Sequence, residues 1–239
     1  MKVLGLDSSG LVAGVALIQD DVLIAEYTTD YKKTHSQTLL PMLDELRRMV
    51  DLDLKSIDLI AVAAGPGSFT GLRIGSATAK GLGLALDIPL AAVPTVDALA
   101  YNLYGCEQLI CPMMDARRSQ VYTAGFSWEQ GRLTRLLPDC AISIEELGDA
   151  LKKCEKPKIL VGDGATLCYN TLGSFLTDLT LAPEHLRLQR ASGVALAALE
   201  QIKGGAVPSA AQLTPNYLRL SQAERERVER EAKAQKGEY

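Results

Sequence analysis

The chain has 239 residues, 47% of them apolar and 23% charged, which excludes disordered, collagen-like and disulfide-dense classes. Its 25 basic and 29 acidic side chains give a net charge of -4, so the chain as a whole has no cationic field for binding nucleic acid alone. The five cysteines lack a C-x-x-C spacing and no apolar run reaches the ~20 residues of a membrane span, so we expect a reduced, cytoplasmic protein that does not enter a membrane.

The first hundred residues predict a three-stranded antiparallel meander followed by alternating helices and strands. Runs rich in Val, Ile and Leu, separated by turn-prone pairs, lie at 2–8, 12–19 and 22–29. A capping box at 34–37 predicts a helix that ends near Val50. Further elements are expected as a buried strand at 57–64, a helix at 69–86, a strand at 88–93 and a short helix at 96–103.

The same order of elements recurs after residue 105. We expect strands at 109–114, 120–127 and 133–137, a helix that begins at a capping box on Ser143, a strand at 158–161 and a helix at 192–202. Two similar halves of this kind predict an α/β fold with two lobes. We place the lobes at 1–104 and 105–220, followed by a charged tail at 221–239.

A glycine-rich segment, GPGSFTGLRIG at 65–75, lies between a buried strand and a helix. A helix N-terminus can receive phosphate, but neither the Walker pattern nor G-x-G-x-x-G fits these residues. The alternative is close packing of this helix against another part of the backbone, because Gly71, Gly75, Ala79 and Gly83 leave one stripe of the helix without large side chains. We favour packing over phosphate binding.

Both long helices carry more apolar surface than a single sheet contact requires. The apolar residues at 39–50 span an arc of about 180°. Between Phe69 and Leu86 the only charged residues are Arg73 and Lys80. Core packing explains part of this apolar surface, and we hypothesise that an interface with another chain explains the rest.

Asp7, followed by Ser8, closes the first strand, and Asp115 closes the matching strand of the second half. Two such turns across a cleft form a candidate cofactor site for Mg²⁺ or phosphate, although Asp7 is also explained as a turn-stabilising residue. An independent ATP-dependent enzyme that uses these three residues is therefore the alternative function. A peptidase would need a zinc site, and His35 and His185 have no metal-ligand spacing.

Seven segments together resemble the TsaB (YeaZ) family of bacterial proteins. In chain order they are VLGLDSS, HSQTLLPML, AVAAGPGSFTGLRIG, AAVPTVDALA, MDARRSQVY, VGDGA and PNYLR, between about residue 1 and residue 220. The resemblance implies the two-lobed fold of the actin, sugar kinase and Hsp70 superfamily (ASKHA, ribonuclease H-like). This agrees with the repeat of elements.

The resemblance also implies a function in making N6-threonylcarbamoyladenosine beside the tRNA anticodon. In that family the TsaB subunit is non-catalytic, dimerises with the transferase TsaD or with a second copy of itself, and is joined by the ATPase TsaE. ATP and a metal ion then belong to the partner subunits, this chain has no cofactor or metal of its own, and tRNA is bound only through the complex. Where TsaD carries an H-x-x-x-H metal pair, this chain has Thr95 and Leu99, which cannot replace imidazole ligands.

The implied contact with TsaD joins the first two long helices of each chain in a four-helix bundle. The residues that we expect at this interface are Leu39, Leu43, Leu46, Gly71, Ile74, Gly75, Thr78 and Leu82. Arg117, Arg118, Arg132 and Arg135 are candidates for a local basic patch, to which we assign no role.

Overall fold

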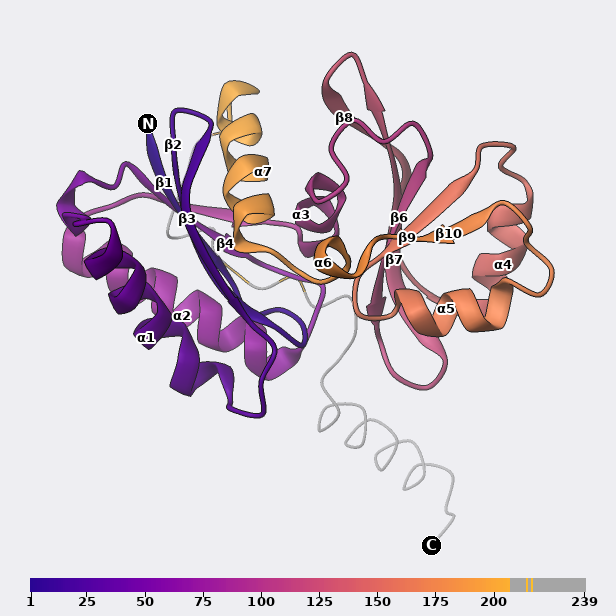
Figure 1. The fold of residues 1–239 in the computed structure, drawn as a ribbon, viewed down its shortest axis with the longest axis horizontal. Coiled ribbons are helices and arrows are strands. Elements are labelled where there is room, and N and C mark those ends of the chain that lie inside the picture. Colours follow the sequence, from indigo (N-terminus) through magenta and orange to yellow (C-terminus); the bar gives the residue numbers. More distant parts are fainter. Residues whose placement is uncertain (207–213, 215, 217–239) are drawn as a thin grey trace, which may run out of the picture.

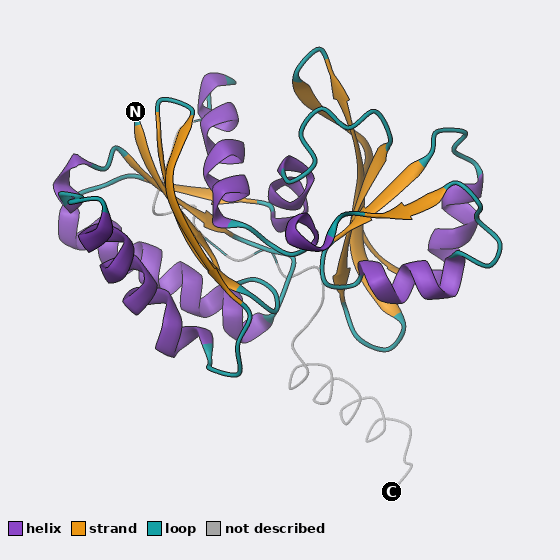
Figure 2. Ribbon diagram, in the orientation of Figure 1, coloured by secondary structure: helices purple, strands orange, loops and turns teal. Residues whose placement is uncertain are grey.

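The computed structural model describes residues 1–206, 214 and 216, and it contains two α/β lobes that lie side by side (Figures 1 and 2). Each lobe is built on a five-stranded sheet. The strand order is β3-β2-β1-β4-β5 in the first sheet and β10-β9-β6-β7-β8 in the second. The two orders become identical when β6 to β10 are matched with β1 to β5, so the predicted internal repeat is present.

The first sheet begins with the predicted meander, β1 (Lys2–Asp7), β2 (Ala13–Gln19) and β3 (Val22–Thr29). β4 (Leu59–Ala63) joins the other edge of β1 in parallel, and β5 (Leu90–Val93) follows β4. The helices α1 (His35–Met49) and α2 (Phe69–Leu86) cover one face of this sheet, and a 3-10 turn (Leu54–Ser56) leads into β4. The capping box at Thr34 and Gln37 is present at the start of α1.

The second sheet repeats this plan with longer antiparallel strands. Its elements are β6 (Leu109–Asp115), β7 (Gln120–Glu129), β8 (Arg132–Ser143), α4 (Ile144–Lys152), β9 (Lys158–Val161), α5 (Ala165–Leu172), β10 (Leu179–Leu181) and α6 (Glu184–Arg187). β8 is longer than the strand expected at 133–137, because it pairs with β7 along most of its length despite register shifts near Gly125. The sequence patterns did not predict α5 and β10.

The last described helix, α7 (Ala191–Lys203), packs with α3 (Thr95–Tyr101) against the second face of the first sheet. Its residues Val194, Ala195 and Ala198 are in the same buried cluster as Val3 and Leu59. We expected residues 105–220 to form the second lobe, but within that range α7 contributes to the core of the first. Its apolar face matches the sheet face that α1 and α2 leave open.

The side chain of Glu26 on β3 anchors the start of α7. It accepts hydrogen bonds from Arg190 Nε (3.0 Å), Ser192 N (2.9 Å) and Ser192 Oγ (2.7 Å). A β-carbon on Gly5 would lie 2.2 Å from Ala191 O, so only glycine at this point of β1 permits the approach of the helix.

No helix in the described part of the chain is long and apolar enough to span a membrane. The five cysteines, all among the described residues, are free thiols, and Cys111 and Cys168 are buried. The charged tail expected at 221–239 lies outside the described residues.

Candidate functional site

Asp7 ends β1 at the junction of the two lobes. Its Oδ1 accepts hydrogen bonds from Ser9 N (2.8 Å) and Ser9 Oγ (2.6 Å), whereas Oδ2 has no partner among the described residues. The residue is 1% exposed. Burial raises the pKa of Asp7 to about 6, although the two bonds from Ser9 oppose the shift. One carboxylate oxygen therefore stabilises the turn, and the other is unused.

Ser8 contacts α2 and is not open to a ligand. Its Oγ donates a hydrogen bond to Gly71 O at 2.9 Å. A β-carbon on Gly71 would lie 2.0 Å from Ser8 O, and one on Gly75 would lie 2.6 Å from Ser8 Oγ. The two glycines are needed because α2 lies directly against the turn between β1 and β2.

The start of α2 uses backbone donors that a phosphate would need. Ser68 N donates to Ser9 O at 2.7 Å, and Gly71 N donates to Ser68 Oγ at 3.3 Å. A phosphate loop requires such amides to point into open space. The residues at 65–75 therefore do not fit a phosphate, and the packing interpretation accounts for them.

Asp115 ends β6, the second-lobe counterpart of β1. Its carboxylate accepts a hydrogen bond from Arg117 N at 2.7 Å and pairs with Arg117 Nη1 at 3.2 Å. Its backbone N donates to Asp163 Oδ1 at 3.1 Å. Burial is the main cause of the raised pKa of Asp7, and the charge of Asp163 adds a smaller contribution; burial also raises the pKa of Asp163 itself. The pKa of Asp7 therefore depends in part on Asp163, a residue to which no sequence pattern assigned a function.

Gln189 is a second residue beside this cleft that sequence reasoning missed. It is 1% exposed, and neither of its amide atoms has a partner among the described residues. A β-carbon on Gly10 would lie 2.3 Å from Gln189 Nε2, and His35 Nε2 lies 3.0 Å from Gly10 O. A glutamine just before a helix reads as an ordinary surface residue, so no signal in the sequence indicated its burial. The described residues contain no group of three His, Cys, Asp or Glu side chains that could hold a metal ion.

The expected interface residues on α1 lie inside the first lobe. Leu39, Leu43 and Leu46 are at most 4% exposed and pack against the sheet. Ile74 and Leu82 of α2 are half-buried against the same cluster. Thr78 is half-buried, while Gly71 and Gly75 face the turn at Ser8. The broad apolar arc of α1 arises because this helix contacts both the sheet and α2.

Comparison with known proteins places these features in a family. Residues 23–226 match the family model described as TsaD, tRNA N6-adenosine threonylcarbamoyltransferase. The Bacillus subtilis tRNA threonylcarbamoyladenosine biosynthesis protein TsaB is 34% identical over 232 residues, which are 96% of this chain and 99% of that protein. The chain belongs to the TsaB (YeaZ) family.

Solved structures agree with this assignment. YeaZ from Pseudomonas aeruginosa matches with a TM-score of 0.74 and 26% identity, covering 91% of this chain and 99% of that one. Component A of (R)-2-hydroxyglutaryl-CoA dehydratase from Acidaminococcus fermentans shares the fold alone, with a TM-score of 0.50, 11% identity, and 85% and 99% coverage. The predicted α/β fold class with two similar lobes is confirmed.

Core residues occupy the two positions that the family resemblance aligns with the metal ligands of TsaD. Thr95 is fully buried, and its Oγ1 accepts a hydrogen bond from Gly65 N at 3.2 Å. Leu99 is 1% exposed and packs in a cluster with Ile110 and Phe126. In this TsaB-family chain both positions therefore serve packing.

The four arginines considered for a basic patch lie apart. Arg117 and Arg118 precede β7, whereas Arg132 and Arg135 lie on β8, where they pair with Glu129 and Phe126 towards the other end of β7. Arg117 pairs with Asp115, and Arg135 pairs with Asp97 and Asp139. The structure therefore does not gather them into one patch.

Proposed function

We propose that this chain is the non-catalytic subunit that binds TsaD and thereby supports N6-threonylcarbamoylation of the tRNA adenosine next to the anticodon. The proposal is supported by family membership and by the core residues Thr95 and Leu99 at the positions of the TsaD metal pair. ATP and a metal ion are then expected in TsaD and TsaE, and tRNA is bound by the whole complex.

The observation that carries the proposal is an exposed stripe on α2. Ala77, Gly81, Leu84 and Ala85 are all exposed, and at about 100° per residue they lie within an arc of about 100°. Leu84 is 89% exposed. Leu40 of α1 is also exposed, at 51%. A partner helix can therefore bury these exposed side chains without disturbing the core residues behind.

Gly81 is the residue of this stripe that the fold itself does not explain. A glycine inside a helix costs about 1 kcal/mol relative to alanine. In α2 the cost is explained at Gly71, Gly75 and Gly83, because a β-carbon there would lie under 3.0 Å from other atoms. At Gly81 a β-carbon would meet no atom of the described chain within 4 Å. Close approach of a partner backbone accounts for this glycine.

The test is Gly81→Phe, with Asn170→Phe as the matched control on the exposed face of α5. Both variants should fold, since the new ring points into solvent in each. Gly81→Phe should weaken TsaD binding at least tenfold, about 1.4 kcal/mol or more, and lower tRNA modification by the mixture. The measurements are calorimetric titration with purified TsaD and a threonylcarbamoylation assay. Equal dissociation constants for Gly81→Phe and the unmodified chain would contradict this interface.

The same stripe is available to a second copy of the chain when TsaD is absent. We propose a homodimer through α2 that TsaD displaces. Light scattering should then report a dimer for the free chain, a monomer for Gly81→Phe, and a heterodimer after TsaD is added.

We propose no nucleotide chemistry for the cleft at Asp7. Of the three residues of the candidate cofactor site, Ser8 is bonded to Gly71 and Asp115 to Arg117. Among the side-chain oxygens of these three residues, only Asp7 Oδ2 lacks a partner within the described part of the chain. The isolated chain should therefore show no ATP turnover above a buffer control, and turnover lost in Asp7→Asn would favour the alternative of an independent enzyme.

A further inference from the structure

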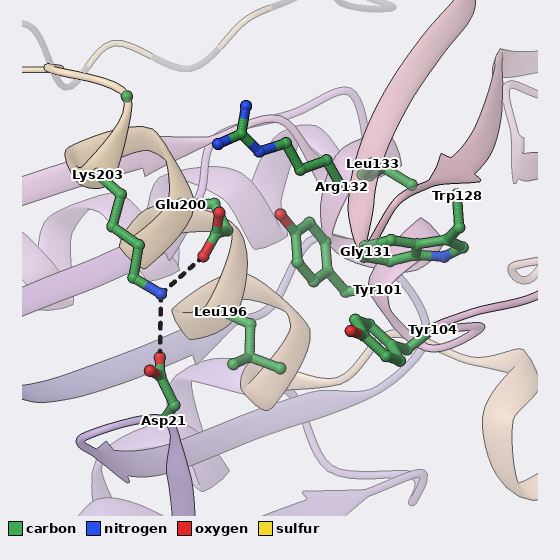
Figure 3. Close-up of a pocket in the computed structure, with 11 residues that line it drawn as sticks. Asp21, Tyr101, Tyr104, Trp128, Gly131, Arg132, Leu133, Leu196, Glu200 and Lys203 are labelled. Atoms are coloured by element: carbon green, nitrogen blue, oxygen red, sulfur yellow. Dashed lines mark hydrogen bonds and ion pairs between the residues drawn. The ribbon is translucent and has the colours of Figure 1, made fainter.

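A cavity of about 810 Å³ lies between the lobes at the end of the molecule opposite Asp7. It is bounded by Asp21 in the turn after β2, by α3 and the residues that follow it, by the β7–β8 turn, and by α7 (Figure 3). The hydrogen bond from Asp20 N to Met1 O places that turn beside the amino end of β1, whereas Asp7 is at its carboxyl end. The cavity is therefore separate from the cleft at Asp7, and its size is typical of small-molecule sites.

Three aromatic rings form one wall of the cavity. Tyr101 and Trp128 meet edge to face at 5.3 Å, and Tyr104 lies 4.6 Å from Trp128 at 56°. Tyr104 is 71% exposed, unusual for a side chain of this size. The β7–β8 turn passes close by, since a β-carbon on Gly131 would lie 3.6 Å from Tyr104 Oη. A planar ligand that stacks on this wall would cover aromatic surface now open to water.

The opposite wall carries charges that are already paired. Lys203 Nζ lies 2.8 Å from Glu200 Oε1 and 3.4 Å from Asp21 Oδ1, as Figure 3 shows. Arg132, by contrast, forms no ion pair within the described part of the chain, and it lines the cavity from the start of β8. The unpaired charge of the lining is thus positive, which favours a ligand with one anionic group.

We propose that this cavity binds a single nucleotide unit, with its base stacked on Tyr104 and Trp128 and its phosphate near Arg132. Every nucleobase has a π face that stacks on aromatic side chains. The guanidinium of arginine matches the geometry of a phosphate. One unpaired cation suits a monophosphate, free or within a strand, better than a triphosphate. Binding here is independent of the α2 stripe.

Trp128 provides the assay, because it is the chain's only tryptophan and part of the stacking wall. The probes are 5′-AMP, adenosine and a single-stranded RNA tetranucleotide, each titrated while Trp128 fluorescence is recorded. Equilibrium dialysis with labelled probe supplies dissociation constants that do not depend on fluorescence. Saturable quenching by 5′-AMP identifies a free nucleotide, and quenching by the tetranucleotide alone identifies a strand; either result supports the proposal.

The variants replace exposed side chains, so each of them should fold like the unmodified chain. Tyr104→Ala should weaken binding by about fivefold or more, while Tyr31→Ala, equally exposed at 69% but outside the cavity, should not. Arg132→Ala should weaken 5′-AMP binding about tenfold and leave adenosine binding unchanged, with the exposed Arg118→Ala as control. The proposal is overturned if no probe saturates at millimolar concentration, or if Tyr104→Ala and Tyr31→Ala bind alike.

Discussion

Replacing Asp7 by asparagine tests the energetic account of the cleft. Asparagine keeps an oxygen that can accept the two hydrogen bonds from Ser9, and it removes the buried charge. The pKa of Asp7 is raised from 3.8 to about 6 because the folded chain buries the carboxyl group. A shift of about two units corresponds to about 3 kcal/mol at most, at 1.36 kcal/mol per unit.

The sign of the effect follows from proton binding. The folded chain holds the Asp7 proton more tightly than the unfolded chain, so the stabilisation is fully present below about pH 4 and is lost as the pH rises through about 6. The Asp7→Asn variant has no carboxyl group at this position, so its stability does not fall in this way as the pH rises. Its free energy of unfolding should therefore exceed that of the unmodified chain by up to about 3 kcal/mol at pH 7.5, and the difference should shrink towards pH 4.

Urea unfolding of both proteins at half-unit steps from pH 4 to pH 7.5 measures this difference directly. Asp30→Asn, at an exposed position, is the control and should show no comparable pH dependence. A difference between Asp7→Asn and the unmodified chain that stays constant over the whole range would refute the assignment of a buried, proton-binding carboxyl group to Asp7.

Two further predictions concern the packing of helices on the first sheet. Glu26→Ala removes the acceptor for Arg190 and for the first turn of α7, so urea unfolding should report a loss of about 2–3 kcal/mol; Glu45→Ala, at an exposed position, should change stability by under about 0.5 kcal/mol. Gly75→Ala should destabilise by about 1–3 kcal/mol because its β-carbon meets Ser8 Oγ, whereas Gly81→Ala in the same helix should stabilise by about 0.5–1 kcal/mol. If both alanine variants changed the free energy of unfolding in the same direction, the contacts of the new β-carbons would not determine the change in stability.

The elements that the sequence predicted well are those with strong local signals. The meander of β1 to β3, the capped starts of α1 and α4, and the bounds of α2 follow from periodicity and capping residues. α5 and β10 have weaker local signals. α5 begins at Ala165 with no side-chain cap, and β10 has three residues, so neither forms a pattern long enough to recognise.

For the functional residues, too, the sequence predicts what local patterns encode and misses what long-range contacts decide. The position of Asp7 at a strand end follows from the local pattern, but its raised pKa depends on burial and on Asp163 from the other lobe. The burial of Gln189 likewise depends on a turn far away in the chain. The apolar arc of α1 shows the converse limit: periodicity gives the width of an apolar face, but it does not say whether the sheet, a neighbouring helix or another chain covers it.

The position of α7 has a consequence for how the protein is made. The sheet face that includes Val3, Leu59 and Val93 is covered by a helix that begins at Ala191. A ribosome therefore synthesises the whole second sheet before the first lobe can complete its core. Until then an apolar sheet face of the nascent chain stays open to water and to chaperones. Long-range contacts of this kind, such as those that join the regions around residues 3 and 194, also slow folding, because the ends of a long loop must meet first.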